Sequence, residues 1–219
     1  MNELEKNRKD LETCDDQIFD LLLTRNHIIE QIMSDKVMSD KEAQRIQARK
    51  LFNYNIILIG FMGTGKSTVA ELLSTLFALK VVEMDQVITE REQMSISDIF
   101  ATYGEEYFRS LETKLLIELQ SQTNMVISCG GGVAMRDENV REMKKNGKVV
   151  LLTASPEVIL ERVKGSDERP LLDGNKNIEF IQELIASRKQ KYQAAADVTI
   201  HTDHKSTMAI CKELIMKLL

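Results

Sequence analysis

A glycine-rich segment with the sequence GFMGTGKS occupies residues 60–67 and has the GxxxxGK[ST] spacing that binds nucleotide phosphates. Its glycines let the loop curl so that backbone N–H groups point inward, where they meet phosphate oxygens. We expect Lys66 to reach the β- and γ-phosphates and the hydroxyl of Ser67 to bind Mg²⁺. An ordinary glycine-rich turn is the alternative, but the apolar run before the loop and the helical pattern after it favour phosphate binding.

The sequence therefore predicts a bound nucleotide whose phosphates lie in the loop and at the start of the following helix. The residues expected to contact the nucleotide there are Gly63, Thr64, Gly65, Lys66, Ser67 and Thr68. This motif alone does not distinguish a kinase from a motor, a GTPase or a switch.

Short β-branched runs alternate with longer helical patterns from residue 54 onward, which predicts an α/β fold with a parallel sheet flanked by helices. Residues 2–50 contain no Gly and no Pro and favour one long helix with a break near residues 34–39. A loop is expected at 165–177, where Gly and Pro stand among charged residues. The expected strands are 55–59, 80–84, 125–128, 148–153 and 197–201, and the expected helices are 66–77, 95–101, 105–122, 138–145, 156–164, 178–195 and 206–219.

The composition excludes several classes of protein. Hydrophobic residues make up 43% of the chain, but the run at 56–59 is too short to cross a membrane, and the charged N-terminus does not resemble a secretory signal. We therefore expect a cytoplasmic protein. A net charge of −5 and the lack of Trp disfavour a nucleic-acid partner. The Cys and His residues have no metal-ligand spacing, so a metal bound wholly by side chains is not expected.

Over residues 54–219 the sequence resembles the shikimate kinases. The likeness rests on separated fragments in a fixed order, which are GFMGTGKST, VVEMDQVI, GEEYFRSLE, VISCGGGVA, RPLL and SRKQKYQAAADVTI. The resemblance implies a P-loop fold like that of the nucleoside monophosphate kinases, with a parallel five-stranded sheet. It also implies transfer of phosphate from ATP, with Mg²⁺, to the 3-hydroxyl of shikimate in aromatic amino acid biosynthesis.

The resemblance implies roles for two acidic residues. Asp85, at the end of the second expected strand, lies at the carboxyl edge where open parallel sheets bind ligands. The resemblance implies that Asp85 orients the attacking hydroxyl and accepts its proton; a cap of the next helix is the alternative role. Shikimate kinases usually carry Asp two residues earlier, where it supports Mg²⁺ through water, whereas this chain has Glu83. Glu83 keeps the carboxylate but moves it by one methylene.

The carboxylate of shikimate is assigned to two arginines. Arg109 and Arg188 are suited to this role because the planar guanidinium group binds carboxylates in a bidentate manner, and the surrounding motifs support the assignment. Directly after the third expected strand, glycines allow close approach of the substrate and leave backbone N–H donors free. These substrate-binding glycines are Gly130, Gly131 and Gly132.

The resemblance also assigns basic residues to the nucleotide. Arg169, in the expected loop at 165–177, would cover the phosphates when the loop closes and would neutralise charge on the transferring group. We count it as catalytic together with Lys66 and Asp85. Arg162 is placed at the adenine or ribose edge, and Lys205 at the other face of the adenine.

Residues 1–50 precede the expected kinase domain at 51–219 and form a helical extension. With Arg8, Asp15, Arg25 and Lys36 at the matching spacing, they resemble the first helix of the all-helical chorismate mutases, but the further helices that a working mutase needs are missing. Dimerisation or docking to an enzyme of the same pathway is the expected role, and ligand sensing or packing on the kinase domain stays open. A repeat of coiled-coil type runs through Leu4, Arg8, Leu11, Asp15, Ile18, Leu22, Arg25, Ile29 and Ile32, and its charges would need partners on a buried seam.

Two other functions stay open at this point. A different small-metabolite kinase of the gluconate kinase type would share the fold and the phosphate loop. A nucleotide-dependent regulatory or adaptor protein would use the helical extension as its working part. The intact set of Lys66, Ser67, Asp85, Arg109 and Arg169 argues against the second alternative.

Overall fold

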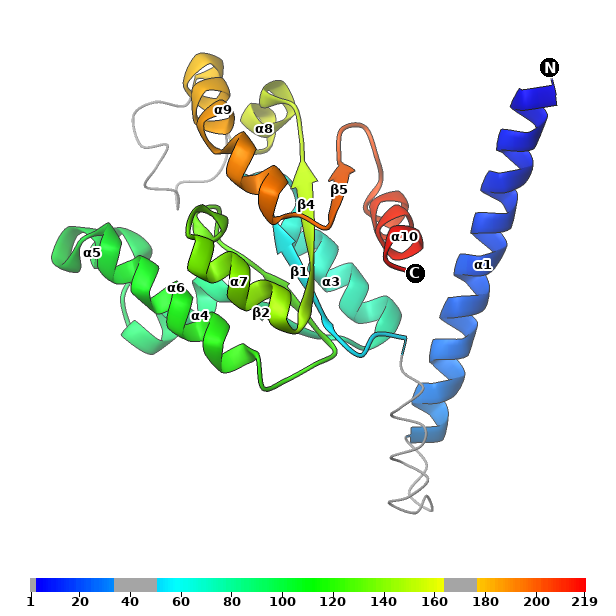
Figure 1. The fold of residues 1–219 in the computed structure, drawn as a ribbon, viewed down its shortest axis with the longest axis horizontal. Coiled ribbons are helices and arrows are strands. Elements are labelled where there is room, and N and C mark those ends of the chain that lie inside the picture. The colour runs from blue at the N-terminus through cyan, green and yellow to red at the C-terminus, as the bar shows by residue number, and fades with distance from the viewer. Residues whose placement is uncertain (1–2, 34–50, 164–176) are drawn as a thin grey trace.

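The computed structural model describes residues 3–33, 51–163 and 177–219, and Figure 1 shows a twisted sheet between helices with one long helix alongside. The sheet has five parallel strands in the order β2-β3-β1-β4-β5. The strands are β1 (Asn55–Ile59), β2 (Lys80–Glu83), β3 (Met125–Ser128), β4 (Gly147–Thr153) and β5 (Val198–His201).

The central strands are almost wholly apolar because helices cover both of their faces. Alternate residues of a strand point to opposite faces, so Ile57 joins the core on one side of the sheet and Ile56 joins the core on the other. Leu58 of β1 and Glu83 of β2 both pair with Ser128 of β3, so the three strands end level with one another. The loops that follow them therefore open at one edge of the sheet.

The helices lie in two layers. One face of the sheet is covered by α4 (Met84–Glu92), α5 (Ile96–Tyr103), α6 (Glu105–Leu119), α7 (Asp137–Lys145) and α9 (Ile178–Ala195). The other face is covered by α3 (Lys66–Phe77) and α10 (Thr207–Leu218). A short 3₁₀ turn (Val133–Met135) follows β3, and α8 (Pro156–Val163) packs with α9. Within the described ranges, no helix is long and apolar enough to cross a membrane.

The predicted strands and the helices after β1 are confirmed to within a few residues, with one helix missed. β2 ends at Glu83, and α4, which the sequence analysis does not predict, begins at Met84. Asp85 therefore lies in the first turn of a helix instead of at the end of a strand, and the N-cap position belongs to Glu83. No Gly or Pro separates the two elements, so the sequence gives no sign of the boundary.

The N-terminal helix α1 (Glu3–Met33) lies against α3 and α10 (Figure 1). The ring of Phe19 meets that of Phe77 edge-on, with centroids 6.1 Å apart. Nδ2 of Asn26 donates to the backbone oxygen of Leu76 at 3.3 Å, and the Asp16 carboxylate pairs with Lys212. One face of α1 is thus packed on the rest of the chain, as the packing alternative expected.

The predicted repeat of α1 does not form a single seam in this chain. Leu22 and Ile29 face the contact with α3 and α10, as partly buried and buried residues. The charged Arg8 and Arg25 are exposed, so in the single chain they do not need a partner in a buried seam. The apolar residues Leu4, Leu11, Ile18 and Ile32 are exposed as well. The predicted break near residues 34–39 lies outside the described residues.

Candidate active site

A cavity of about 650 Å³ opens where the loops after β1, β2 and β3 meet, and this volume is typical of a small-molecule site. It is lined by every described residue that the sequence analysis assigned to nucleotide, metal or substrate. Arg169 lies outside the described residues. The predicted residues brought together here are Gly63, Thr64, Gly65, Lys66, Ser67, Thr68, Glu83, Asp85, Arg109, Gly130, Gly131, Gly132, Arg162, Arg188 and Lys205.

The glycine-rich loop connects β1 to α3 and forms one wall of the cavity. Gly60 has a φ of 139°, and a Cβ at this position would lie 2.2 Å from the backbone oxygen of Leu152, so no other residue fits. Nζ of Lys66 donates to the backbone oxygens of Gly60 and Phe61, both at 3.0 Å, which places the ammonium group inside the curl of the loop. No side chain caps the start of α3, so its first N–H groups are available to an anion.

Two carboxylates line the cavity where β2 passes into α4. A Cβ on Gly130 would come within 2.5 Å of Oδ1 of Asp85 and 3.0 Å of Oε1 of Glu112. The missing side chain of Gly130 therefore makes room for the carboxylates of Asp85 and Glu112. Oε1 of Glu83 is buried and accepts no hydrogen bond from any described residue.

Arg109 is held in place from several sides. Its NH1 group donates to Oε2 of Glu112 at 2.9 Å, and its NH2 group donates to Oε1 of Glu105 at 2.6 Å. The guanidinium lies 5.5 Å from the ring centroid of Phe108, and its side chain is only 12% exposed. A Cβ on Gly132 would lie 2.3 Å from Cζ of Arg109. The arginine thus fills the space that the glycine leaves.

Glu112 is fully buried in the wall of the cavity. Burial raises the pKa of its carboxyl to about 7, and the negative charge of Asp85 acts in the same direction. The guanidinium of Arg109 lowers the pKa but does not compensate for the lost hydration. Burial thus makes the Glu112 carboxylate easier to protonate than an exposed one, while it accepts a hydrogen bond from Arg109.

Arg188 lines the cavity from α9, and Tyr192 lies one turn further along the same helix. The hydroxyl of Tyr192 donates to the backbone oxygen of Gly131 at 2.5 Å, and NH1 of Arg188 donates to the same oxygen at 3.4 Å. The guanidinium of Arg188 also lies 5.9 Å from the ring centroid of Phe61 in the phosphate loop. α9 thereby connects the segment Gly130–Gly132 to the phosphate loop.

Arg162 joins the phosphate loop to the segment after β5. Its NH1 group donates to the backbone oxygen of Gly63 and to the hydroxyl of Thr202, both at 3.1 Å. Lys205, further along the same segment, pairs with Glu213 at 2.5 Å. Both basic residues line the cavity on the side of the phosphate loop and α10. Arg162 has a bracing role that the sequence analysis does not predict.

The sequence analysis missed Glu112, the buried partner of Arg109. Its position three residues after Arg109 in a predicted helix puts the two side chains on the same face, and this spacing could have identified the pair. It also missed the aromatic residues that surround the guanidinium, Phe100 and Phe108. Their contacts depend on the packing of α5 against α6, which no local pattern reveals.

The donor set fits a magnesium ion. Mg²⁺ prefers oxygen ligands, and in phosphate-transfer sites it combines one or two protein ligands with phosphate oxygens and water. The hydroxyl of Ser67 and the carboxylate of Glu83 line the same cavity. Because Oε1 of Glu83 is buried without a hydrogen bond from any described residue, it is an acceptor that a metal-bound water would satisfy.

Comparisons with known proteins show which family this chain resembles. The family model "Shikimate kinase" matches residues 62–219. A shikimate kinase of Persephonella marina is 45% identical over 161 residues, which cover 74% of this chain and 96% of that protein. A second, of Sulfurihydrogenibium, is 42% identical over 164 residues, which cover 75% of this chain and 97% of that protein.

A solved structure has the same fold. "Shikimate kinase from Acinetobacter baumannii in complex with shikimate" aligns with a TM-score of 0.74 and 30% identity, covering 78% of this chain and 96% of that one. The parallel five-stranded sheet with a phosphate loop after β1 is the P-loop kinase fold that the sequence predicts. From the family match, the identity to these relatives and the shared fold, it follows that the chain belongs to the shikimate kinase family.

Proposed function

We propose that this chain transfers the γ-phosphate of ATP to the 3-hydroxyl of shikimate. The observation that carries this proposal is that one cavity is lined by a phosphate loop, by the guanidinium groups of Arg109 and Arg188 and by the carboxylate of Asp85. The loop suits the phosphates of ATP, and the guanidinium groups suit the carboxylate of a small hydroxy acid. The solved relative named as a complex with shikimate supports this choice of substrate.

On the nucleotide side, Lys66 would hold the β- and γ-phosphates, together with the backbone N–H groups of residues 63–68. Ser67 and Glu83 would hold Mg²⁺, which when bound neutralises charge on the phosphates. Arg162 would contact the adenine or ribose while it braces the loop, and Lys205 would line the adenine face. Arg169 would cover the transferring phosphate.

On the substrate side, Arg109 and Arg188 would clamp the carboxylate of shikimate. Arg109 suits this role because Glu105, Glu112 and the ring of Phe108 fix its orientation before any ligand arrives. The backbone at Gly130, Gly131 and Gly132 would form the surface against which the ring of the substrate lies.

The reaction requires positioning more than covalent chemistry from the protein. The 3-hydroxyl oxygen attacks the γ-phosphorus, the bond to the oxygen that bridges the β- and γ-phosphates breaks, and ADP leaves. Asp85 orients the hydroxyl and accepts its proton. Lys66 and Arg169 stabilise the negative charge that spreads over the transferring group.

A steady-state assay that couples ADP formation to a second enzyme tests the proposal. With ATP, Mg²⁺ and shikimate, we expect saturable turnover, and gluconate in place of shikimate should give none. Asp85→Asn should reduce kcat by about 10²–10⁴-fold while ATP binding persists, because it removes the proton acceptor and leaves the phosphate loop intact. Turnover on gluconate alone, or full activity of Asp85→Asn, would contradict the proposal.

Residues 1–50 form, in our proposal, a separate helical extension of a catalytic domain at 51–219. The family match begins only at residue 62, and β1 begins at Asn55. The extension would serve assembly, either with a second copy of the chain or with another enzyme of the shikimate pathway. Such an ATP-consuming biosynthetic enzyme is expected to work in the cytoplasm.

A further inference from the structure

An exposed row of apolar residues runs along α1. We call it the α1 stripe, and its positions alternate in steps of three and four residues, which is the spacing of a coiled-coil seam. Its large apolar members are between 43% and 68% exposed, although side chains of this kind are usually buried. The α1 stripe consists of Leu4, Asn7, Leu11, Cys14, Ile18, Leu21, Arg25, Ile28 and Ile32.

The α1 stripe is not the face that packs on the kinase fold. Most of the packed residues follow a stripe residue by one position, as Phe19 follows Ile18 and Ile29 follows Ile28, and Leu23 lies two positions after Leu21. One residue corresponds to about 100° around a helix, so the two faces point in different directions. Packing against α3 and α10 therefore leaves the α1 stripe uncovered.

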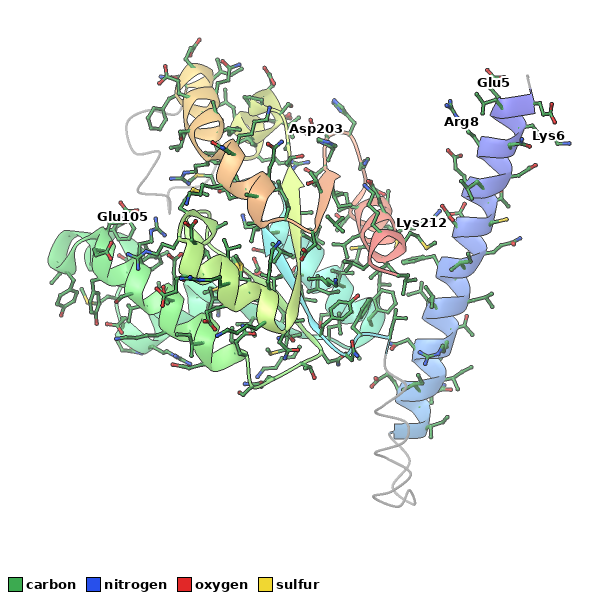
Figure 2. All side chains as sticks on the ribbon, in the orientation of Figure 1. Glu5, Lys6, Arg8, Glu105, Asp203 and Lys212 are labelled. Carbon is green, nitrogen blue, oxygen red and sulfur yellow. The ribbon has the colours of Figure 1, made fainter. Side chains whose placement is uncertain are left out.

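The N-terminal part of α1 is the most exposed part of this helix among the described residues. All side chains of residues 3–14 are exposed, and Figure 2 shows Glu5, Lys6 and Arg8 at the end of α1 that projects beyond Lys212. An isolated helix of this length is only marginally stable in water. A partner that covers Leu4 and Leu11 would supply the missing stabilisation.

We propose that the α1 stripe pairs with the same stripe of a second copy of this chain, as an antiparallel two-helix coiled coil. The inference rests on the assembly role proposed for the extension and is independent of the proposed phosphoryl transfer. In one antiparallel register, apolar positions face apolar positions and polar positions face polar positions. The facing pairs are then Leu4 with Ile28, Leu11 with Leu21, Cys14 with Ile18 and Asn7 with Arg25.

The two polar positions select this register. Arg25 would face the amide of Asn7, whose oxygen can accept a hydrogen bond from the guanidinium. A shift by one heptad in one direction would place Asn7 against Ile32, and a shift in the other would place it against Ile18. A polar residue against an apolar one on a seam is destabilising, and this is how such residues fix the register of coiled coils.

A parallel pair is less favourable. In a parallel pair, Arg25 of one copy would face Arg25 of the other. At the two edges of the seam, Asp10 of each copy would lie near Asp15 of the other copy. In the antiparallel register only one like-charged pair, the two Asp15 side chains, flanks the axis of symmetry among the described residues of α1. The antiparallel arrangement also lays the projecting half of each helix along the packed half of the other, so both projecting halves are covered.

The mass of the full chain in solution tests the dimer. One chain has a mass of 25.0 kDa, and we expect light scattering with size exclusion at micromolar concentration to give twice this value. Leu11→Glu should raise the dissociation constant by about 100-fold or more, because it places charges in the seam. Kinase activity should not change, since Leu11 is 64% exposed and does not line the cavity of the candidate active site.

Ile117→Glu is the matched control. Ile117 is 49% exposed on α6, so the substitution adds the same charge on an exposed apolar side chain away from the α1 stripe. It should leave the dimer intact. A wild-type chain that is monomeric at 100 μM, or equal dissociation by both substitutions, would overturn the proposal. If the wild-type chain is a monomer that still phosphorylates shikimate, the dimer proposal is wrong and the proposed function stands.

Disulfide trapping tests the orientation. Cys14 is exposed, whereas Cys129 and Cys211 are buried. In the proposed register, the two Cys14 residues lie about 6 Å apart along the axis on helices about 8–10 Å apart, beyond the reach of a disulfide. Oxidation of the wild-type chain should therefore give no covalent dimer, whereas a parallel pair would cross-link through Cys14.

The decisive variant combines Cys14→Ser, Leu11→Cys and Leu21→Cys. It should form a covalent dimer on mild oxidation, because positions 11 and 21 of the two copies face each other. The same chain with only one of the two new cysteines should not cross-link. A covalent dimer from either single-cysteine chain, or none from the combined variant, would refute the antiparallel register.

Discussion

The substitution Glu112→Gln should stabilise the fold and, at the same time, weaken the binding of substrate. Burial raises the pKa of Glu112 from 4.5 to about 7 in the folded chain. A raised pKa of an acid means that the folded state holds its proton more tightly than the unfolded state does. The contribution of Glu112 to stability is therefore fully present below about pH 4.5 and is lost as the pH rises through 7.

The magnitude follows from the same values. The interval between 4.5 and about 7 corresponds to about 3 kcal/mol at about 1.4 kcal/mol per pKa unit. Gln cannot ionise, so Glu112→Gln should stabilise the chain by about 3 kcal/mol at pH 8 and by less than about 1 kcal/mol at pH 5. At about 2–4 °C per kcal/mol for a chain of this size, the melting temperature should rise by about 6–12 °C at pH 8.

The same change should impair substrate binding. The charged hydrogen bond from Arg109 to Glu112 at 2.9 Å becomes a neutral one, and hydrogen bonds to charged groups are worth about 1.5–3 kcal/mol. If Glu112 fixes the orientation of Arg109, the KM for shikimate should rise about 10–100-fold. The KM for ATP should stay nearly constant, because Glu112 hydrogen-bonds to Arg109 and lies beside Gly130, both on the proposed substrate side.

Calorimetry and steady-state kinetics from pH 5 to pH 8 measure both effects. Glu118→Gln is the control, since Glu118 lies on the same helix and its exposed ion pair with Arg91 should contribute less than about 1 kcal/mol. A stabilisation by Glu112→Gln that does not grow between pH 5 and pH 8 would refute the reasoning about burial. An unchanged KM for shikimate would refute the positioning role.

Two further substitutions test the packing around Gly130–Gly132. Gly132→Ala would place a Cβ 2.3 Å from Cζ of Arg109. Chemical unfolding should therefore show a loss of about 1–3 kcal/mol in the free energy of unfolding, and the KM for shikimate should rise. Gly131→Ala is the control, because its Cβ would lie 3.6 Å from its nearest neighbour, and it should cost less than about 1 kcal/mol. Tyr192→Phe removes the 2.5 Å hydrogen bond to Gly131 and should lower the free energy of unfolding by about 1–2 kcal/mol in urea titration; an unchanged value would contradict the assigned bond.

The sequence was most informative where local chemistry determines structure. The apolar run at 55–59 and the glycines after it predict β1 and the phosphate loop, because a buried parallel strand and a positive φ each limit the residues allowed. The motif resemblance placed Arg109 and Arg188 in the same site. These residues come together because α6, which carries Arg109, and α9, which carries Arg188, cover the same face of the sheet.

The sequence was less informative where tertiary packing determines structure. α4 follows β2 without any break residue, so the boundary at Met84 was missed. Glu112 shares a helix face with Arg109, which the spacing indicates, but its burial beside Asp85 follows from tertiary packing. In α1, the packed face and the α1 stripe differ by one residue, as with Ile18 and Phe19, so the helical period alone does not tell which face meets the kinase fold.

Direct transfer of phosphate is the central claim, and isotope labelling tests it. ATP with a ³²P-labelled γ-phosphate is incubated with the full chain, Mg²⁺ and shikimate, and the product is assigned by ³¹P and proton NMR of an unlabelled parallel reaction. The account predicts one labelled phosphate on the 3-oxygen of shikimate for each ADP formed, and no transfer by Lys66→Ala. Label found only as inorganic phosphate, or on another hydroxyl, would contradict it.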